Sequence, residues 1–263
     1  MSKIKHLLKN IKLTTPIAVI IGAIIIGGSI IIVGKTVNQK IDDQSSALSA
    51  FFSDLTGKKV NLNNKAPSAP STQFTGKAID SKDYVLGNAK SNVTVIEYSD
   101  PECPFCAQFH PTIKSMMNDY GNKISFVYRQ FPLTSIHQHA FDESRAIACA
   151  GKIGGTKSYY DYMNALFDYK FNKQTTQLTK TGKEDLANSI GLDMTKFNSC
   201  MNNNDTATEV NDSMADGVKA GVQGTPSTFV LVKKGSEYQV VAMIDGARPY
   251  DFVKAAVDQA LSK

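Results

Sequence analysis

The chain has 263 residues, 42% of them hydrophobic, which is enough for one large or two small globular domains. Its net charge is +5, but six of its 29 basic residues lie among the first 40 residues, which contain no Asp or Glu. The rest of the chain carries 23 basic and 24 acidic residues. The basic excess therefore belongs to the N-terminus, and nothing indicates a nucleic-acid partner.

An uncharged stretch of 22 residues, mostly Ile, Val, Gly and Ala, spans residues 13–34. As a helix it would be about 33 Å long, enough to cross a hydrocarbon core of about 30 Å. Four lysines precede it, whereas Lys35 and Lys40 are soon offset by Asp42. This bias predicts a cytoplasmic N-terminus and an exported body. A cleaved signal peptide and a buried soluble helix are the alternatives.

These features predict three regions. Residues 1–35 are expected to form a cytoplasmic tail and transmembrane anchor, residues 36–75 a linker, and residues 76–263 the folded body. Within the linker, Ser45–Leu55 has the pattern of a short amphipathic helix, and residues 61–72 are polar and contain prolines.

The first half of the body predicts a β–α–β unit. Val93–Tyr98 is a buried strand candidate, and residues 103–120 are expected to be helical, with a kink at Pro111. Gly121-Asn122 ends that helix. Residues 123–131 form the next predicted strand, with alternate apolar side chains on one face.

From Ser135 to about Gly221 the pattern is helical, with amphipathic stretches separated by glycines. Residues 228–232 and 238–244 predict a hairpin, and residues 250–261 predict an amphipathic helix. The fold class is therefore α/β with one mixed sheet: a thioredoxin-type plan with an all-helical insertion at about 135–221.

The sequence Cys103-Pro104-Phe105-Cys106 follows the first strand and opens the helix. Two thiols at this spacing can close a small disulfide, and the positive helix N-terminus stabilises a thiolate on Cys103. We expect Cys103 to be exposed, with its sulfur facing free N–H groups, and Cys106 to be more buried. Zinc sites and structural disulfides use the same spacing, and His110 could add a third ligand.

The chain resembles DsbA-type thiol–disulfide oxidoreductases over about residues 84–262. The resemblance rests on three segments: Leu86-Gly87, residues 95–106 and residues 224–229. The resemblance implies that Cys103 attacks and Cys106 resolves. It further implies a cis Thr225–Pro226 bond that faces the cysteines, and a Thr225 backbone that pairs with a substrate strand. The alternative is an ordinary turn at that place.

Glu97 is a carboxylate within the apolar strand before Cys103. Burial should raise its pKa and allow it to exchange a proton with Cys106. The resemblance also places a buried acid at this position, and a strand-edge residue paired with Lys is the alternative. The negative charges of Asp100 and Glu102 oppose thiolate formation, so we expect no extremely low pKa for Cys103.

Cys149 and Cys200 both fall in the helical block. Outside the cytoplasm two remaining cysteines usually pair, and closing a loop of about 50 residues contributes roughly 3–4 kcal/mol. We therefore expect a structural disulfide. Two buried free thiols and a second redox relay are the alternatives.

The sequence predicts a membrane-anchored, extracytoplasmic thiol–disulfide oxidoreductase, in the first instance a dithiol oxidase acting on exported protein thiols through Cys103 and Cys106. The resemblance implies reoxidation by a quinone-linked membrane oxidase of the DsbB or vitamin-K-epoxide-reductase kind, and no organic cofactor is expected. A reductase or isomerase of the same fold is the first alternative. A tethered binding or metal-carrier protein is the second.

Overall fold

The computed structural model describes residues 73–178 and 181–263. The predicted transmembrane anchor and the amphipathic segment Ser45–Leu55 lie outside this part of the chain, as does nearly all of the predicted linker. No helix within the described residues is both long enough and apolar enough to cross a membrane.

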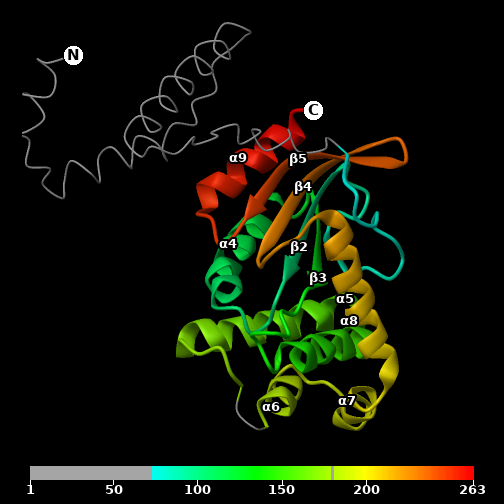
Figure 1. The fold of residues 1–263 in the computed structure, drawn as a ribbon, viewed down its shortest axis with the longest axis vertical. Coiled ribbons are helices and arrows are strands. Elements are labelled where there is room, and N and C mark those ends of the chain that lie inside the picture. The colour runs from blue at the N-terminus through cyan, green and yellow to red at the C-terminus, as the bar shows by residue number, and fades with distance from the viewer. Residues whose placement is uncertain (1–72, 179–180) are drawn as a thin grey trace, which may run out of the picture. The chain divides into compact units, whose positions relative to one another are not determined.

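A five-stranded mixed sheet forms the centre of the fold (Figure 1). Its spatial order is β1 (Val85–Gly87), β3 (Ser125–Gln130), β2 (Val93–Ser99), β4 (Ser227–Lys234) and β5 (Glu237–Asp245). Strands β2 and β3 are parallel, and every other neighbouring pair is antiparallel. The parallel pair needs a crossover, which α4 (Pro104–Tyr120) supplies.

Four helices separate β3 from β4: α5 (Ala140–Lys173), α6 (Gly182–Ser189), α7 (Met194–Met201) and α8 (Asn204–Ala220). The chain ends in the predicted helix, α9 (Tyr250–Leu261). Figure 1 shows α5, α6 and α7 gathered beyond one end of the sheet, while α8 lies alongside it. The predicted mixed α/β fold with a helical insertion is therefore confirmed.

The two faces of the sheet bury different cores, because successive side chains of a strand point to opposite sides. Val95, Phe126 and Val230 lie in one core with residues of α4, α5 and α9. Ile96 and Val127, the neighbours of Val95 and Phe126, lie in a second core on the other face. The cysteines of the C-x-x-C motif belong to the first core.

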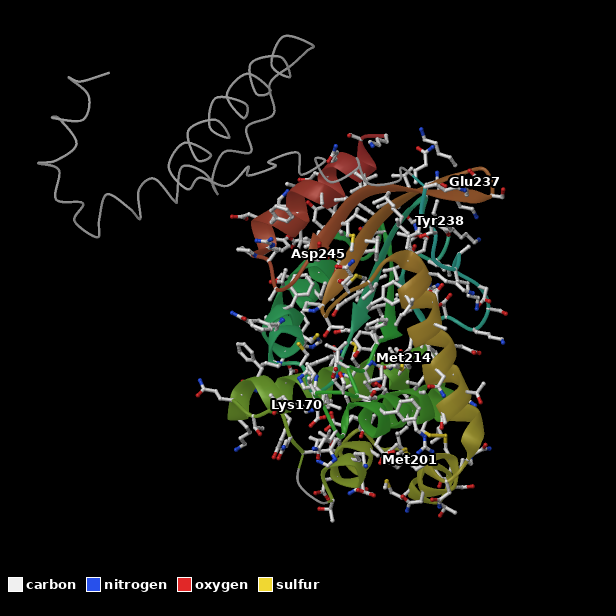
Figure 2. The ribbon with its side chains drawn as sticks, in the orientation of Figure 1. Lys170, Met201, Met214, Glu237, Tyr238 and Asp245 are labelled. Atoms are coloured by element: carbon white, nitrogen blue, oxygen red, sulfur yellow. A yellow bond between two sulfur atoms is a disulfide. The ribbon has the colours of Figure 1, made fainter. Side chains whose placement is uncertain are left out.

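The hairpin is confirmed, but its strands are longer than predicted. Lys234 pairs with Glu237, so only Gly235 and Ser236 form the turn. Gly235 has a φ of 64°, which a two-residue hairpin turn requires at its first position. Figure 2 shows β5 running from Glu237 and Tyr238 at the turn to Asp245 at its far end.

Two features of the described body differ from the sequence analysis. Strand β1 was not predicted; it has only three residues, too few for a periodic pattern. Phe74 is buried and its N–H donates to the carbonyl of Tyr238 at 2.9 Å, so the body starts before residue 76.

Candidate active site

Cys103 occupies the N-cap of α4, directly before Pro104. Proline suits the first helical position because that position needs no N–H donor. The Cys103 carbonyl accepts from the N–H groups of Cys106 at 3.1 Å and Ala107 at 3.2 Å, which closes the first turn. This turn brings the two cysteines together at the end of β2.

The Cys103 thiol has a pKa lowered to about 6. The largest cause is a hydrogen bond from Cys106, which outweighs the opposing effect of burial. The Thr225 hydroxyl and the N–H groups of Cys106 and Phe105 also stabilise the thiolate. The predicted N–H environment is therefore present, and the site holds a thiolate near neutral pH.

The expected exposure of Cys103 is wrong. The residue is only 4% exposed, while Phe105 beside it is 59% exposed. The covering element is the loop before β4, because the Cys103 thiol lies 3.4 Å from the carbonyl oxygen of Thr225. The sequence placed the cysteine on a helix N-terminus, but it gave no means of seeing that a loop 122 residues later closes over it.

Cys106 is the deeper of the two thiols, with an exposed fraction of 1%. Its sulfur accepts a hydrogen bond from the N–H of Asp100 at 3.5 Å. Burial raises the pKa of the Cys106 thiol well above its usual value, and the negative charges of Cys103 and Glu97 add to this. The two sulfurs therefore differ in the way that an attacking and a resolving thiol require.

Glu97 lies on the central strand β2, which pairs with β3 on one side and β4 on the other. It is 4% exposed, and burial raises its pKa to about 7. The strand-edge alternative is excluded by this central position. Since the charge of Glu97 raises the pKa of Cys106, the carboxyl and the thiol interact in the folded protein.

Two hydroxyl side chains flank Glu97, and the sequence analysis singled out neither. Tyr128 and Thr228 are its direct cross-strand partners on β3 and β4. Both hydroxyl oxygens are buried without a hydrogen-bond partner. Directly opposite residues share a face of the sheet, so both lie on the face of the cysteines. Their proximity depends on strand register, which the sequence does not reveal.

The Thr225–Pro226 peptide bond is cis. Gly224 and Ser227 close the turn around it, since the Ser227 hydroxyl donates to the Gly224 carbonyl at 2.8 Å. The Thr225 carbonyl oxygen lies 3.4 Å from the Cys103 thiol. The structure thus brings Thr225 and Pro226 to the cysteines; the pairing of the Thr225 backbone with a substrate strand stays a prediction.

Asp100 and Glu102 are both buried, and their carboxylates bind the loop that leads into α5. Asp100 accepts from the Leu133 N–H at 2.7 Å and contacts His137 Nδ1 at 2.8 Å. Glu102 accepts from the His139 N–H at 2.6 Å. These contacts fix the turn before Cys103 on the loop that leads into α5.

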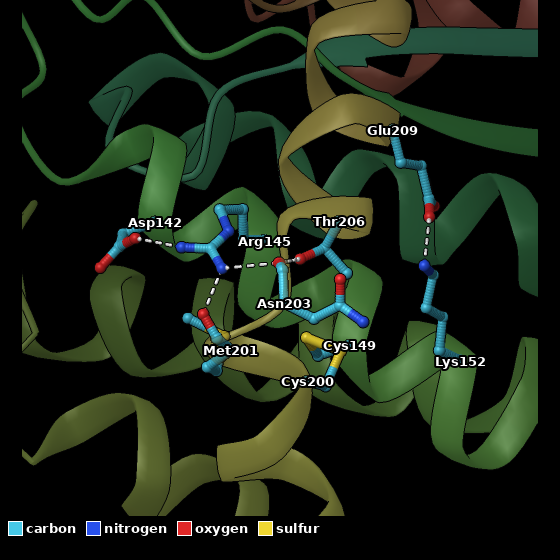
Figure 3. The surroundings of a disulfide bond; sticks show 9 residues. All are labelled: Asp142, Arg145, Cys149, Lys152, Cys200, Met201, Asn203, Thr206 and Glu209. Carbon is cyan, nitrogen blue, oxygen red and sulfur yellow. Dashed lines mark hydrogen bonds and ion pairs between the residues drawn. A yellow bond between two sulfur atoms is a disulfide. The ribbon is translucent and has the colours of Figure 1, made fainter.

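Cys149 and Cys200 are joined by a disulfide, which ties α5 to α7 (Figure 3). Beside it, the Arg145 guanidinium binds the Asp142 carboxylate at 3.2 Å and donates to the carbonyls of Met201 and Asn203. The disulfide and Arg145 therefore fasten the same segment, the junction of α7 and α8, to α5.

His110 lies one helical turn after Cys106 but belongs to a different contact. It is buried against Phe167, with ring centroids 5.2 Å apart, and burial lowers its pKa to about 4. Among residues 73–178 and 181–263, no group of three or more His, Cys, Asp or Glu side chains is arranged to hold a metal ion.

Two cavities lie elsewhere in the described body. One of about 410 Å³ adjoins Cys200 and is lined by Lys152, Lys196 and Asn203. The other, of about 630 Å³, lies beside β3 and includes Arg129 and Glu209 in its walls. Neither is lined by Cys103 or Cys106, so the redox site is a surface turn capped by a loop and belongs to neither cavity.

Comparison with known sequences agrees with this geometry. The family model described as thioredoxin matches residues 80–255. A provisionally named protein-disulfide oxidoreductase of Rickettsia prowazekii is 30% identical over 201 residues, which cover 75% of this chain and 68% of that protein. A Na(+)/H(+) antiporter of Salinispora arenicola is 29% identical over 149 residues, but the chain spans only 22% of its length.

Solved structures show the same fold. A thioredoxin-like oxidoreductase from Silicibacter pomeroyi has a TM-score of 0.55 at 25% identity and covers 70% of this chain and 95% of its own. BdbD from Bacillus subtilis has a TM-score of 0.59 at 21% identity, with 73% and 100% covered. With the paired thiols at the start of α4, these matches show that the chain belongs to the thioredoxin family as a DsbA-type thiol–disulfide oxidoreductase.

Proposed function

We propose that the enzyme works as a dithiol oxidase for exported proteins. The observation that carries this proposal is the low pKa of Cys103, about 6, opposite a Cys106 thiol whose pKa is raised. A stabilised thiolate stabilises the reduced form of the pair, and a stable reduced form makes the disulfide a stronger oxidant.

The reaction starts from a Cys103–Cys106 disulfide. A substrate thiolate attacks the Cys103 sulfur, forms a mixed disulfide and releases Cys106 as the leaving thiolate. Glu97 supplies its proton, since its pKa of about 7 keeps part of it protonated near neutral pH. The second substrate thiolate then attacks the substrate sulfur and releases Cys103, so two electrons pass from the substrate to the enzyme.

Protein substrates are favoured by the surroundings of Cys103. Phe105 offers an exposed aromatic ring close in sequence to the reacting cysteine, and the Thr225 carbonyl lies 3.4 Å from the Cys103 thiol. An apolar ring beside backbone groups suits an extended segment of an incompletely folded protein. Reoxidation is proposed to come from a quinone-linked membrane oxidase of the DsbB or vitamin-K-epoxide-reductase kind.

The N-terminal segment is proposed to hold the enzyme in the same membrane, with the catalytic body on the extracytoplasmic side. The support is the uncharged stretch at 13–34 and the lysines before it. Membrane fractionation of the full chain tests this, with a membrane-impermeant thiol reagent applied to intact cells. Recovery in the soluble fraction, or protection of reduced Cys103 from the reagent, would contradict it.

The direction of electron flow is tested by equilibrating the full chain with glutathione and measuring the reduction potential of the Cys103–Cys106 pair. A value near about −120 mV, as for DsbA, supports the oxidase. A value near about −270 mV, as for thioredoxin, overturns it in favour of a reductase.

The reductase or isomerase alternative has one specific observation in its favour. Phe105 places no charge between the cysteines, whereas a His or Lys there would stabilise the thiolate further. A binding role of the same surface around Cys103 is distinguished from catalysis by trapping of mixed disulfides. Cys106→Ala should accumulate mixed disulfides with cellular proteins and Cys103→Ser should not, whereas a binding protein would keep its partners in both variants.

A further inference from the structure

A buried lysine lies beneath the turn that carries Cys103. Lys170, on α5, is 1% exposed and donates from Nζ to the carbonyl of Pro101 at 2.9 Å. The same Nζ contacts the Glu143 carboxylate at 2.5 Å, and the Glu143 side chain is also 1% exposed. Figure 2 shows Lys170 on the helical layer that lies across the end of the sheet.

The contact depends on the bend in α5. Lys170 and Glu143 are 27 residues apart, which would be about 40 Å in a straight helix. Gly155 leaves the helical conformation, with φ 68° and ψ −159°, and lets the second half of α5 fold back on the first. The bend therefore brings the ammonium of Lys170 and the carboxylate of Glu143 together beside Pro101, which precedes Cys103 by two residues in sequence.

Lys170 is the cation that faces a group of buried carboxylates. Glu143 faces it from the first half of α5, and Asp100 and Glu102 interact with it from the turn before Cys103. His137 contacts Asp100 from the loop before α5. Burial lowers the pKa of Lys170, and the three carboxylates oppose this effect in part.

A buried ion pair contributes little net stability by itself, because desolvation of the two charges offsets their attraction. Stabilisation of the fold therefore does not by itself explain why the Lys170–Glu143 pair is buried here. The hydrogen bond from Lys170 to the Pro101 carbonyl supplies a reason, because Pro101 lies in the turn from Asp100 to Cys103. This turn is closed by a hydrogen bond from the Cys103 N–H to the Asp100 carbonyl at 3.1 Å.

We propose that Lys170 is a positioning residue for the Cys103–Cys106 pair. Its hydrogen bond fixes the Pro101 carbonyl and with it the turn that presents the Cys103 sulfur. Its charge offsets Asp100 and Glu102, which would otherwise disfavour the thiolate. This role belongs to thiol–disulfide exchange itself and holds whichever way electrons flow through the enzyme.

The proposal predicts opposite effects for the two partners. Lys170→Met removes the cation and the hydrogen bond, so the pKa of Cys103 should rise by about one unit. Glu143→Gln leaves the ammonium and its bond to Pro101 in place, so the pKa of Cys103 should stay unchanged or fall. The measurement is the pH dependence of Cys103 alkylation in the reduced full chain, followed by mass spectrometry.

Lys173→Met is the matched control, because Lys173 is exposed on the same helix. It should leave the pKa of Cys103 unchanged. If Lys170→Met does not fold, the double variant Lys170→Met/Glu143→Leu replaces the ion pair by apolar side chains and should still raise the pKa. A Cys103 pKa equal to that of the wild type in a folded Lys170 variant would overturn the proposal and leave the pair a purely structural role.

Discussion

At the residue scale, neutral hydrogen-bond donors make the largest contribution to the stability of the Cys103 thiolate. Burial opposes the charge, yet the pKa falls to about 6, because the Cys106 thiol, the Thr225 hydroxyl and nearby N–H groups all donate toward the sulfur. The two residues between the cysteines bring no charge. The strongest single donor is therefore the resolving cysteine itself, and its removal should change the attacking one.

Cys106→Ala should raise the pKa of Cys103, because it deletes the largest stabilising hydrogen bond. Cys106→Ser keeps a hydroxyl donor at the same place and should raise the pKa by less. Thiolate absorbance at 240 nm against pH measures both. The same pKa in the Ala and Ser variants would mean that the helix N-terminus, and not Cys106, carries the effect.

Glu97 links catalysis to stability. Its pKa is about 7 in the folded protein against an ordinary value of 4.5, so the folded state keeps the proton to a higher pH than the unfolded chain does. The stabilisation is fully present below about pH 4.5 and is lost as the pH rises through about 7. The shift corresponds to about 3 kcal/mol.

Glu97→Gln should remove this dependence. As the pH rises from 4 to 8, the wild type should lose about 3 kcal/mol of unfolding free energy that the variant does not lose. Thiol–disulfide exchange should slow in the variant because the proton donor is lost. Urea titrations of the reduced proteins across this range measure the first effect. Glu237→Gln, at the exposed hairpin turn, controls for loss of a charge, and a parallel pH profile of Glu97→Gln and wild type would contradict the argument.

At the scale of elements, local patterns were enough for most of the fold. Alternating apolar side chains predicted β3, and the residue patterns at 103–120, 228–232 and 238–244 predicted α4 and the hairpin. What escaped prediction depends on contacts between distant segments. The bend at Gly155 places Lys170 on Glu143, the register of β2 places Thr228 beside Glu97, and the Thr225 loop covers Cys103.

The Cys149–Cys200 disulfide should stabilise the helical insertion mainly through the unfolded state. It spans 51 residues, for which loop closure contributes about 4 kcal/mol. The double variant Cys149→Ala/Cys200→Ala should lose about 3–4 kcal/mol in urea-induced unfolding. A loss below about 1 kcal/mol would mean that the contacts of Arg145 alone hold α7 to α5.

At the scale of the described body, the sheet separates two buried polar groups. Glu97 and the cysteines lie on the face of α4 and α9, whereas Arg129 lies on the other face, where α8 packs. Arg129 bonds to Asp83 at 3.0 Å, Asp216 at 2.7 Å and the carbonyl of Lys77 at 2.8 Å. It thereby joins the segment before β1, strand β3 and helix α8.

Because of this separation, a substitution at Arg129 should change the stability of the fold without changing the redox chemistry of the cysteines. Arg129→Met leaves the buried carboxylates of Asp83 and Asp216 without their cation, so the unfolding free energy should fall by about 3–5 kcal/mol. The thiols lie across the sheet, so the reduction potential of Cys103–Cys106 should stay at the wild-type value. Arg248→Met, an exposed arginine, should change neither quantity. A shifted potential in Arg129→Met would mean that the sheet transmits strain between its faces. A Cys103 pKa raised by Arg129→Met as far as by Lys170→Met would mean that Lys170 acts through general packing instead of its bond to the Cys103 turn.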